Sequence, residues 1–160
     1  GQQISLAGAA AAAARLVREH GEPLQRPLGT VTHLFPTAAA LASVDPDSFR
    51  MPRSRARTLH ALSGSLASGE IVLARDGDPE HVRAQLLALP GIGPWTADYV
   101  VMRALGDTDV FLATDLGIKR SLERLGVDAE PASALALAER WRPYRSFAMQ
   151  YLWAMPTRAV

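Results

Sequence analysis

The chain has 160 residues, of which 48% are hydrophobic, and this size and composition suit one globular domain and argue against disorder. The formal net charge is +1, so no strong overall basic field points to a nucleic-acid partner. The absence of cysteine excludes disulfides, zinc–thiolate sites and cysteine-bound iron–sulfur clusters, and no apolar run approaches the roughly 20 residues of a membrane span.

Alanine dominates the first segment, 1–24, and predicts a helix, because alanine is the best helix former. Gly21 and Pro23 end this helix. The segment opens without an initiator Met and without the charged and apolar regions of a signal peptide. We therefore interpret the chain as a piece excised from a longer protein.

Short helices are predicted within residues 35–69. Thr37 is placed to cap one, Asp45 or Asp47 starts another, and residues 53–69 form a third that Gly69 ends. Only the segment 70–74, EIVLA, suggests a strand, and it is too short and isolated to build a sheet.

The clearest helix begins at residue 78, where Asp78 is a cap and Pro79 occupies the first turn. One face of it is apolar, through Val82, Leu86 and Leu89. Pro94 opens the next helix, which Gly106 ends, and helical segments at 114–126 and 130–153 complete the chain. The predicted fold class is all-α.

The junction between two of these helices, 89–100, reads LPGIGPWTADYV. Gly91 and Gly93 permit backbone conformations that a side chain forbids, and they expose N–H groups at a helix N-terminus, where the dipole favours an anion. The junction therefore predicts either a phosphate-binding loop or a plain helix–helix turn, because short glycine-containing turns are common.

This junction resembles the helix-hairpin-helix of the DNA glycosylase superfamily, whose hairpin typically reads L-P-G-[IV]-G and is followed by T-A. Further along, DVFLATDLGIKRSL resembles the segment that carries the superfamily's catalytic aspartate, and RWRPYRSFAMQYLW resembles the closing helix of the 3-methyladenine DNA glycosylase II (AlkA-type) family. The resemblance covers essentially the whole chain. It implies one helix-hairpin-helix glycosylase domain over 1–160, with two packed helical layers around a cleft, acting in base excision repair.

The resemblance places the catalytic carboxylate at Asp115, which follows Thr114 at a predicted helix start. Breaking the bond between base and sugar develops positive charge on the sugar, and a nearby carboxylate stabilises that charge or activates the attacking water. The alternative is that Asp115 or Thr114 is only an N-cap. Asp109 is the rival carboxylate, for which we expect a local contact.

Bifunctional relatives carry a lysine after the hairpin, where it forms a Schiff base with the sugar. Trp95 stands at that place here, so the resemblance implies a monofunctional glycosylase that uses water and has no lyase activity. Lys119 is the only lysine of the chain, and we expect it at the surface or on a phosphate, one turn beyond Asp115.

In the AlkA-type family, the matching aromatic residues line the base pocket, and here they are Trp95, Tyr99 and Trp153. Purines alkylated at N3 or N7 are positively charged, and aromatic faces attract cations by about 0.5–2 kcal/mol. The alternative is that these rings belong to the core. We assign two further aromatic residues to the core, Trp141 and Phe147.

The resemblance also implies DNA contacts, from the hairpin residues Gly91, Ile92, Gly93 and Thr96. The residue that fills the gap left by a flipped base matches Gln2 or Gln3, and the polar side chain of Gln3 departs from the leucine that family members carry. Arginines cluster at 50–57, either as a phosphate contact or as a solvated helix face.

No cofactor is implied beyond a monovalent cation, Na⁺ or K⁺, which the superfamily's hairpin binds through main-chain carbonyls; here these belong to Leu87, Leu89 and Ile92. The expected partner is damaged double-stranded DNA, with no membrane contact and a monomeric protein. The family's usual N-terminal β-rich domain is absent, so we expect fusion to another repair domain. We expect a cytoplasmic protein in a bacterium and a nuclear one otherwise.

The alternative function is a non-catalytic helix-hairpin-helix module that binds DNA or a protein.

Overall fold

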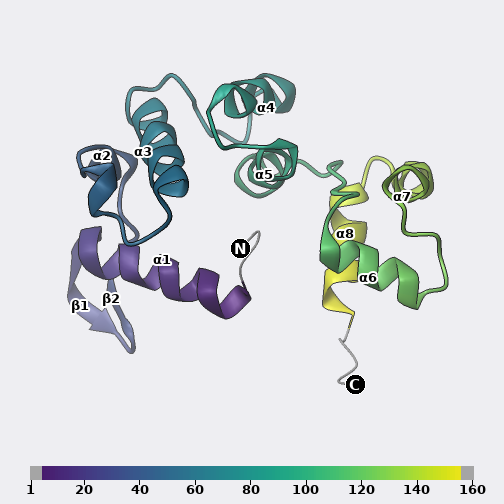
Figure 1. Cartoon of the computed structure of the whole chain (residues 1–160), viewed down its shortest axis with the longest axis horizontal. Helices are drawn as coiled ribbons and strands as arrows, with labels where there is room; N and C mark the ends of the chain where they lie inside the picture. The colour runs from purple at the N-terminus through teal and green to yellow at the C-terminus, as the bar shows by residue number, and fades with distance from the viewer. Residues whose placement is uncertain (1–4, 156–160) are drawn as a thin grey trace. The chain divides into compact units, whose positions relative to one another are not determined.

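The computed structural model describes residues 5–155, and most of them lie in helices (Figure 1). The chain divides into two compact units, one up to Ile71 and one from Val72 onward. The predicted helical fold class is confirmed. Within the described residues, no helix is both long and apolar enough to cross a membrane.

The first unit contains α1 (Leu6–His20), α2 (Ala38–Ala42), the 3₁₀ turn η1 (Pro46–Ser48) and α3 (Arg53–Ala67). As predicted, the Thr37 hydroxyl caps α2, accepting from the Ala40 N–H at 3.1 Å. Asp45, and not Asp47, caps η1. A small core in this unit is made of Leu41 on α2, Phe49 directly after η1 and Ala56 on α3.

A two-stranded antiparallel hairpin follows α1, formed by β1 (Pro23–Leu28) and β2 (Val31–His33), and the sequence analysis missed it. β1 contains two prolines, Pro23 and Pro27, and proline disfavours a strand by propensity. In a two-stranded hairpin each strand is an edge, so a proline can sit where no ladder N–H is needed. Gly29 turns the chain with a φ of +59°. The candidate strand at 70–74 does not form among the described residues.

α1 ends where predicted, at Gly21, and the reason is steric as well as conformational. A Cβ at this position would lie 2.3 Å from the carbonyl oxygen of Leu34 and 2.4 Å from that of Val17. The Gly21 N–H donates to the Val17 carbonyl at 2.9 Å. Only glycine lets the chain leaving α1 pass this close to the backbone that follows β2.

The second unit contains α4 (Pro79–Ala88), α5 (Pro94–Val100), the π-helix η2 (Val101–Leu105), α6 (Leu116–Arg124), α7 (Pro131–Ala138), the 3₁₀ turn η3 (Glu139–Trp141) and α8 (Arg145–Ala154). Asp78 caps α4 and Gly106 ends η2 in the left-handed region, as predicted. The predicted segment 130–153 divides into separate helices near Pro143, which has no N–H to continue a helix.

α6 and α8 lie side by side and enclose most of this unit's core. The core side chains share an apolar character and are drawn from η2, the segment before α6, α6 itself and α8: Met102, Phe111, Leu112, Ile118, Leu122, Met149 and Leu152. This packing holds Asp115, at the start of α6, close to Trp153, at the end of α8.

Candidate active site

The α4–α5 junction is a tight hairpin anchored by one apolar side chain. Ile92 is only 7% exposed, and its N–H donates to the Leu89 carbonyl at 3.2 Å. Gly91 adopts a φ of +89°, which favours glycine. Gly93 is exposed, and its carbonyl accepts from the N–H groups of Thr96 and Ala97 at the start of α5. The buried Ile92 thus leaves the backbone of both glycines at the surface.

An ion pair that sequence reasoning missed ties the two helices of this hairpin together. Nε of Arg83 on α4 lies 2.5 Å from Oδ1 of Asp98 on α5. The hydrogen bond to Asp98 raises the pKa of Arg83, against the opposing effect of partial burial. No sequence signal linked these residues, because pairing across helices depends on how the helices pack.

Asp115 is the N-cap of α6, so the capping interpretation is correct as geometry. Its Oδ1 accepts from the N–H groups of Gly117 at 2.8 Å and Ile118 at 3.0 Å. Two indole groups also donate to this carboxylate: Nε1 of Trp153 to Oδ1 at 2.8 Å, and Nε1 of Trp95 to Oδ2 at 3.1 Å. An N-cap needs only the backbone contacts, so the two tryptophans make Asp115 more than a cap.

The two oxygens of this half-buried carboxylate differ in their surroundings. Oδ1 accepts three hydrogen bonds, whereas Oδ2 accepts one, from Trp95, among the residues that the structure describes. A carboxylate has about four lone-pair positions in total. Oδ2 therefore keeps acceptor capacity for a water molecule or a substrate.

Three aromatic rings gather at this carboxylate, those of Trp95, Tyr99 and Trp153. Trp95 and Tyr99 are stacked, with ring centroids 5.1 Å apart and planes 7° apart, and Trp153 is tilted against Tyr99 at 6.2 Å. The rings are half-buried and pack on the core of the second unit. The core interpretation therefore accounts for part of the surface of each ring, and the rest of that surface is exposed or covered by a neighbouring ring. The guanidinium of the exposed Arg103 lies 5.8 Å from the Tyr99 centroid.

Gly117, which sequence reasoning did not single out, makes room for this arrangement. A Cβ there would lie 3.0 Å from Asp115 Oδ1 and 3.0 Å from Trp153 Cδ1. A side chain at this position in the first turn of α6 would therefore crowd the contact between the Trp153 indole and Asp115.

Several other predicted residues lie at the surface in local pairs. Nζ of Lys119 is 3.9 Å from a Glu130 oxygen. In the first unit, Arg50 pairs with Glu19 and Arg53 with Asp47, at 3.8 and 3.7 Å. Gln2 and Gln3 lie outside the described residues.

One aromatic assignment was wrong. Trp141 packs edge-on against Phe111 at 5.8 Å, as a core residue should, but Phe147 is 54% exposed. The buried face of α8 carries Ser146, Met149 and Leu152, and Phe147 points to the opposite side.

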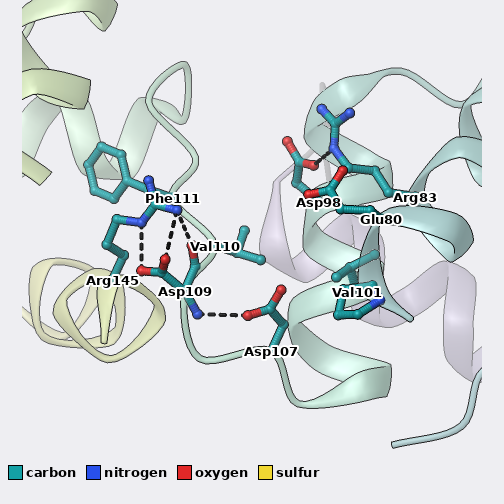
Figure 2. Close-up of a pocket in the computed structure, with 10 residues that line it drawn as sticks. Glu80, Arg83, Asp98, Val101, Asp107, Asp109, Val110, Phe111 and Arg145 are labelled. Atoms are coloured by element: carbon teal, nitrogen blue, oxygen red, sulfur yellow. Dashed lines mark hydrogen bonds and ion pairs between the residues drawn. The ribbon is translucent and has the colours of Figure 1, made fainter. Parts of the chain in front are cut away.

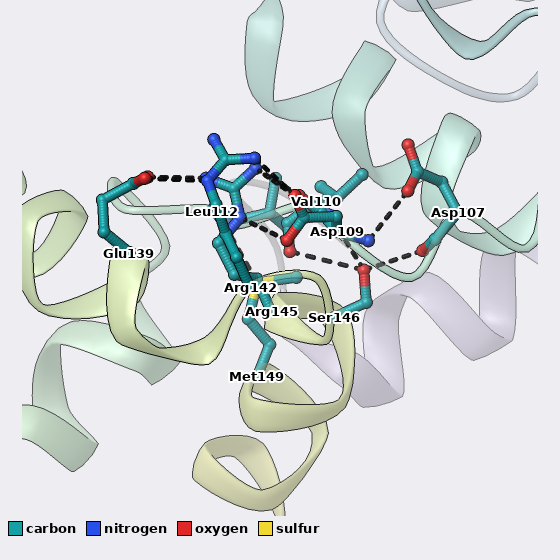
Figure 3. A network of polar contacts seen from close by, with 9 residues as sticks. All are labelled: Asp107, Asp109, Val110, Leu112, Glu139, Arg142, Arg145, Ser146 and Met149. Atoms are coloured by element: carbon teal, nitrogen blue, oxygen red, sulfur yellow. Dashed lines mark hydrogen bonds and ion pairs between the residues drawn. The ribbon is translucent and has the colours of Figure 1, made fainter.

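Asp109, the rival carboxylate, is held by side chains that are distant in sequence, where a local contact was expected. It pairs with Arg142 and Arg145, and both arginines also reach Glu139 (Figure 3). Partial burial would raise the pKa of Asp109, but the hydrogen bond and charge of Arg145 and the charge of Arg142 outweigh it and lower the pKa. This carboxylate is therefore fully engaged by cations.

A cavity of about 190 Å³ lies beside Asp109, between α4, η2 and the start of α8 (Figure 2). Its charged lining residues are Glu80, Arg83, Asp98, Asp107, Asp109 and Arg145. Acidic groups outnumber basic ones, which is unfavourable for a phosphate. None of the predicted base-pocket residues lines it.

No group of three or more histidine, aspartate or glutamate side chains among the described residues could hold a metal ion.

Comparison with known proteins identifies the family. A model of the HhH-GPD superfamily of base excision DNA repair proteins matches residues 1–145. The chain belongs to this superfamily. Over 95% of its length the HhH-GPD chain is 45% identical to the probable bifunctional transcriptional activator/DNA repair enzyme AlkA of Mycobacterium tuberculosis, and over 96% it is 36% identical to DNA-3-methyladenine glycosylase 2 of Escherichia coli.

The chain spans 31% and 53% of the lengths of these two relatives. Among solved structures, the HhH-GPD chain is similar to a 3-methyladenine DNA glycosylase from Archaeoglobus fulgidus, with a TM-score of 0.77 and 30% identity, over 95% of this chain and 53% of that one.

Proposed function

We propose that this HhH-GPD chain is the catalytic part of a DNA glycosylase that hydrolyses the N-glycosidic bond of alkylated purines in double-stranded DNA. The observation that carries the proposal is the convergence of the Trp95 and Trp153 indoles on the Asp115 carboxylate, beside the Tyr99 ring. The names of its relatives, 3-methyladenine DNA glycosylases, support the substrate class.

Asp115 acts on the sugar in this proposal. As the base departs, positive charge moves from the alkylated base to the sugar, which gains oxocarbenium character, and a fixed negative charge beside the sugar stabilises this transition state more than the ground state. Three donors hold Oδ1 in place, and Oδ2 keeps lone pairs for the attacking water or for the sugar.

The aromatic rings act on the base. A cationic purine stacked on an indole face gains about 0.5–2 kcal/mol. Its positive charge also weakens the glycosidic bond, so a loosely shaped pocket suffices for selection. The indole N–H groups of Trp95 and Trp153 are already held by Asp115, which leaves ring faces and edges for the base.

The chemistry proposed is monofunctional. Trp95 stands where a Schiff-base lysine would be needed, and Lys119 faces Glu130 at the surface. Water is therefore the nucleophile, and the product is an intact abasic site.

The hairpin holds the DNA backbone in this proposal. Exposed main-chain groups at Gly91 and Gly93 contact a phosphate without reading sequence. The carbonyls of Leu87, Leu89 and Ile92 stay a prediction for a monovalent cation, and the Leu89 carbonyl already accepts one N–H, from Ile92.

The test is release of methylated purines from duplex DNA treated with dimethyl sulfate, measured by chromatography of the freed bases. Wild-type protein should release them, and untreated DNA should yield none. A protein that binds the duplex but releases no base is a binding module, which would contradict the proposal.

Trp153 and Trp141 give matched variants for the same assay. Both side chains are half-buried, but of these two only Trp153 donates to Asp115. Trp153→Phe should lower the release rate by about 10-fold or more, since it removes a hydrogen bond to a charged group worth about 1.5–3 kcal/mol. Trp141→Phe should lower it much less.

A further inference from the structure

The segment 107–115, which leads into the proposed catalytic Asp115, contains no helix or strand. Buried backbone groups in such a segment need hydrogen-bond partners from elsewhere. In this chain several of these partners come from one face of α8.

Ser146, which is 6% exposed, holds the first part of the segment. Its N–H donates to the Thr108 carbonyl at 2.9 Å, and its hydroxyl donates to the Asp107 carbonyl at 2.8 Å. The same hydroxyl accepts from the Val110 N–H at 3.0 Å. One side chain and its own amide therefore fix residues 107, 108 and 110 of the loop, and Figure 3 draws the contacts of the side chain.

Arg145 and Met149 hold the segment at two further residues, Asp109 and Leu112. Nη2 of Arg145 donates to the Asp109 carbonyl at 2.5 Å, while Nε donates to Asp109 Oδ1 at 2.7 Å. The sulfur of Met149 accepts from the Leu112 N–H at 3.0 Å. The Leu112 carbonyl in turn accepts from the Asp115 N–H at 3.0 Å, which links the held segment to the site.

The C-terminal end of α8 contacts α6 and Asp115. The Ser121 hydroxyl of α6 donates to the Leu152 carbonyl at 2.7 Å, and Trp153 donates to Asp115 itself. Residues 145, 146, 149, 152 and 153 share one face of α8 because they recur at helical spacing. α8 therefore holds the segment that precedes Asp115 in sequence, and it also holds Asp115 and the helix that follows it.

We infer that Arg145 is a positioning residue for Asp115, acting through the Asp109 backbone and the segment 109–115. This inference rests on the proposed function. Arg145 touches no predicted substrate position, but it is the charged member of this α8 face, with a side chain only 13% exposed. Its planar guanidinium binds the Asp109 carboxylate and carbonyl at once, which an ammonium group cannot reproduce.

Arg142 provides a matched control. It also pairs with Asp109 and Glu139, so it belongs to the same charge network. Its side chain is 49% exposed, and its guanidinium binds the carboxylate oxygens of Asp109 and Glu139 and not the loop backbone. Loss of Arg142 removes a charge from the network and leaves the backbone contact of Arg145 intact.

The first measurement is kcat for base release, with duplex affinity measured separately on DNA containing an abasic-site analogue. Misplacement of a catalytic group by about 1 Å costs about 100-fold in rate. Arg145→Gln should lower kcat by about 10–100-fold with duplex affinity unchanged. Arg145→Lys should fall between Arg145→Gln and wild type, and Arg142→Gln should stay close to wild type.

The second measurement does not depend on activity. The chain has three tryptophans, so 5-fluorotryptophan labelling gives three ¹⁹F resonances that single Trp→Phe variants assign. Arg145→Gln and Arg145→Lys should shift the resonance of Trp153, which donates to Asp115, whereas Arg142→Gln should not. Val82→Ala, a cavity variant in α4, controls for lowered stability alone: it should lower Tm and leave the Trp153 resonance in place.

The inference is overturned if Trp153 keeps its resonance in both Arg145 variants, or if Arg142→Gln reproduces their effects. Should Arg145→Gln fail to fold, Arg145→Lys decides both measurements. A wild-type protein that releases no alkylated base would refute the proposed function alone, and the ¹⁹F shifts would still decide whether Arg145 positions Asp115.

Discussion

The variant Gly117→Ala should affect the stability of the protein and the geometry of the proposed active site differently. Where alanine can adopt the native backbone conformation, this substitution ordinarily stabilises a protein by about 0.4–1 kcal/mol, because alanine has fewer unfolded conformations to lose. Here the added Cβ would lie 3.0 Å from Asp115 Oδ1, 3.0 Å from Trp153 Cδ1 and 3.3 Å from Trp153 Nε1. Ordinary contacts with carbon begin near 3.5 Å, so Asp115, Trp153 or both must move by a few tenths of an ångström.

The expected result is a small change in Tm and a large change in activity. The helix gain and the crowding oppose each other in stability, so Tm should move by only a few degrees. The indole–carboxylate contact is lost or displaced, and the single-turnover rate of base release should fall by about 10–100-fold.

Gly64→Ala is the control for this experiment. Gly64 lies inside α3, and a Cβ there meets nothing within 4 Å. It should raise Tm and leave base release unchanged. The steric argument fails if Gly117→Ala releases base at the wild-type rate, or if both variants lose activity equally.

Three further predictions concern the hairpin, the reaction type and the ion pairs. Gly91→Ala forces alanine to a φ of +89°, at a cost of about 1–3 kcal/mol, and should weaken binding to damaged and undamaged duplexes alike in filter-binding titrations; loss on damaged DNA alone would contradict a phosphate contact. Borohydride added during the reaction should trap no covalent protein–DNA adduct on a denaturing gel, whereas a band that vanishes in Lys119→Ala would mean Schiff-base chemistry. The lowered pKa of Asp109 means that its ion pairs stabilise the fold fully above the ordinary carboxyl pKa, near 3.9, and less as the pH falls through the folded value. The Tm difference between wild type and Asp109→Asn should therefore be constant near neutral pH and shrink below about pH 4; a difference that persists unchanged at pH 3 would refute the ionic origin.

Much of the second unit was predictable because its signals are local. The cap at Asp78, the glycine at Gly106 and the hairpin glycines each act within a few residues, and each lies where the sequence indicates. Trp95 and Tyr99 could be placed on one helix face from their spacing alone. That Trp153 joins them depended on family resemblance, because no local rule connects the end of α8 to α5.

The contacts that sequence reasoning missed all join distant segments. The Arg83–Asp98 pair, the Arg145–Asp109 contacts and the crowding at Gly117 follow from how helices pack, which periodicity does not specify. The β1–β2 hairpin was missed for a different reason. Its prolines oppose a strand by propensity, and the exception for edge strands applies only when the pairing is known.

Asp115→Asn tests the central claim most directly, since it removes the negative charge and keeps the size of the side chain. Gly117, Ile118 and Trp153 can still donate to the remaining amide oxygen, so the start of α6 should keep its structure. The measurement is the single-turnover rate of 3-methyladenine release from an alkylated duplex, with duplex affinity determined on the same preparation. The rate should fall by at least about 100-fold while affinity stays the same or tightens, because the charge that stabilises the sugar is lost and repulsion with phosphates is relieved. Release at close to the wild-type rate would contradict the assignment of Asp115 as the catalytic carboxylate.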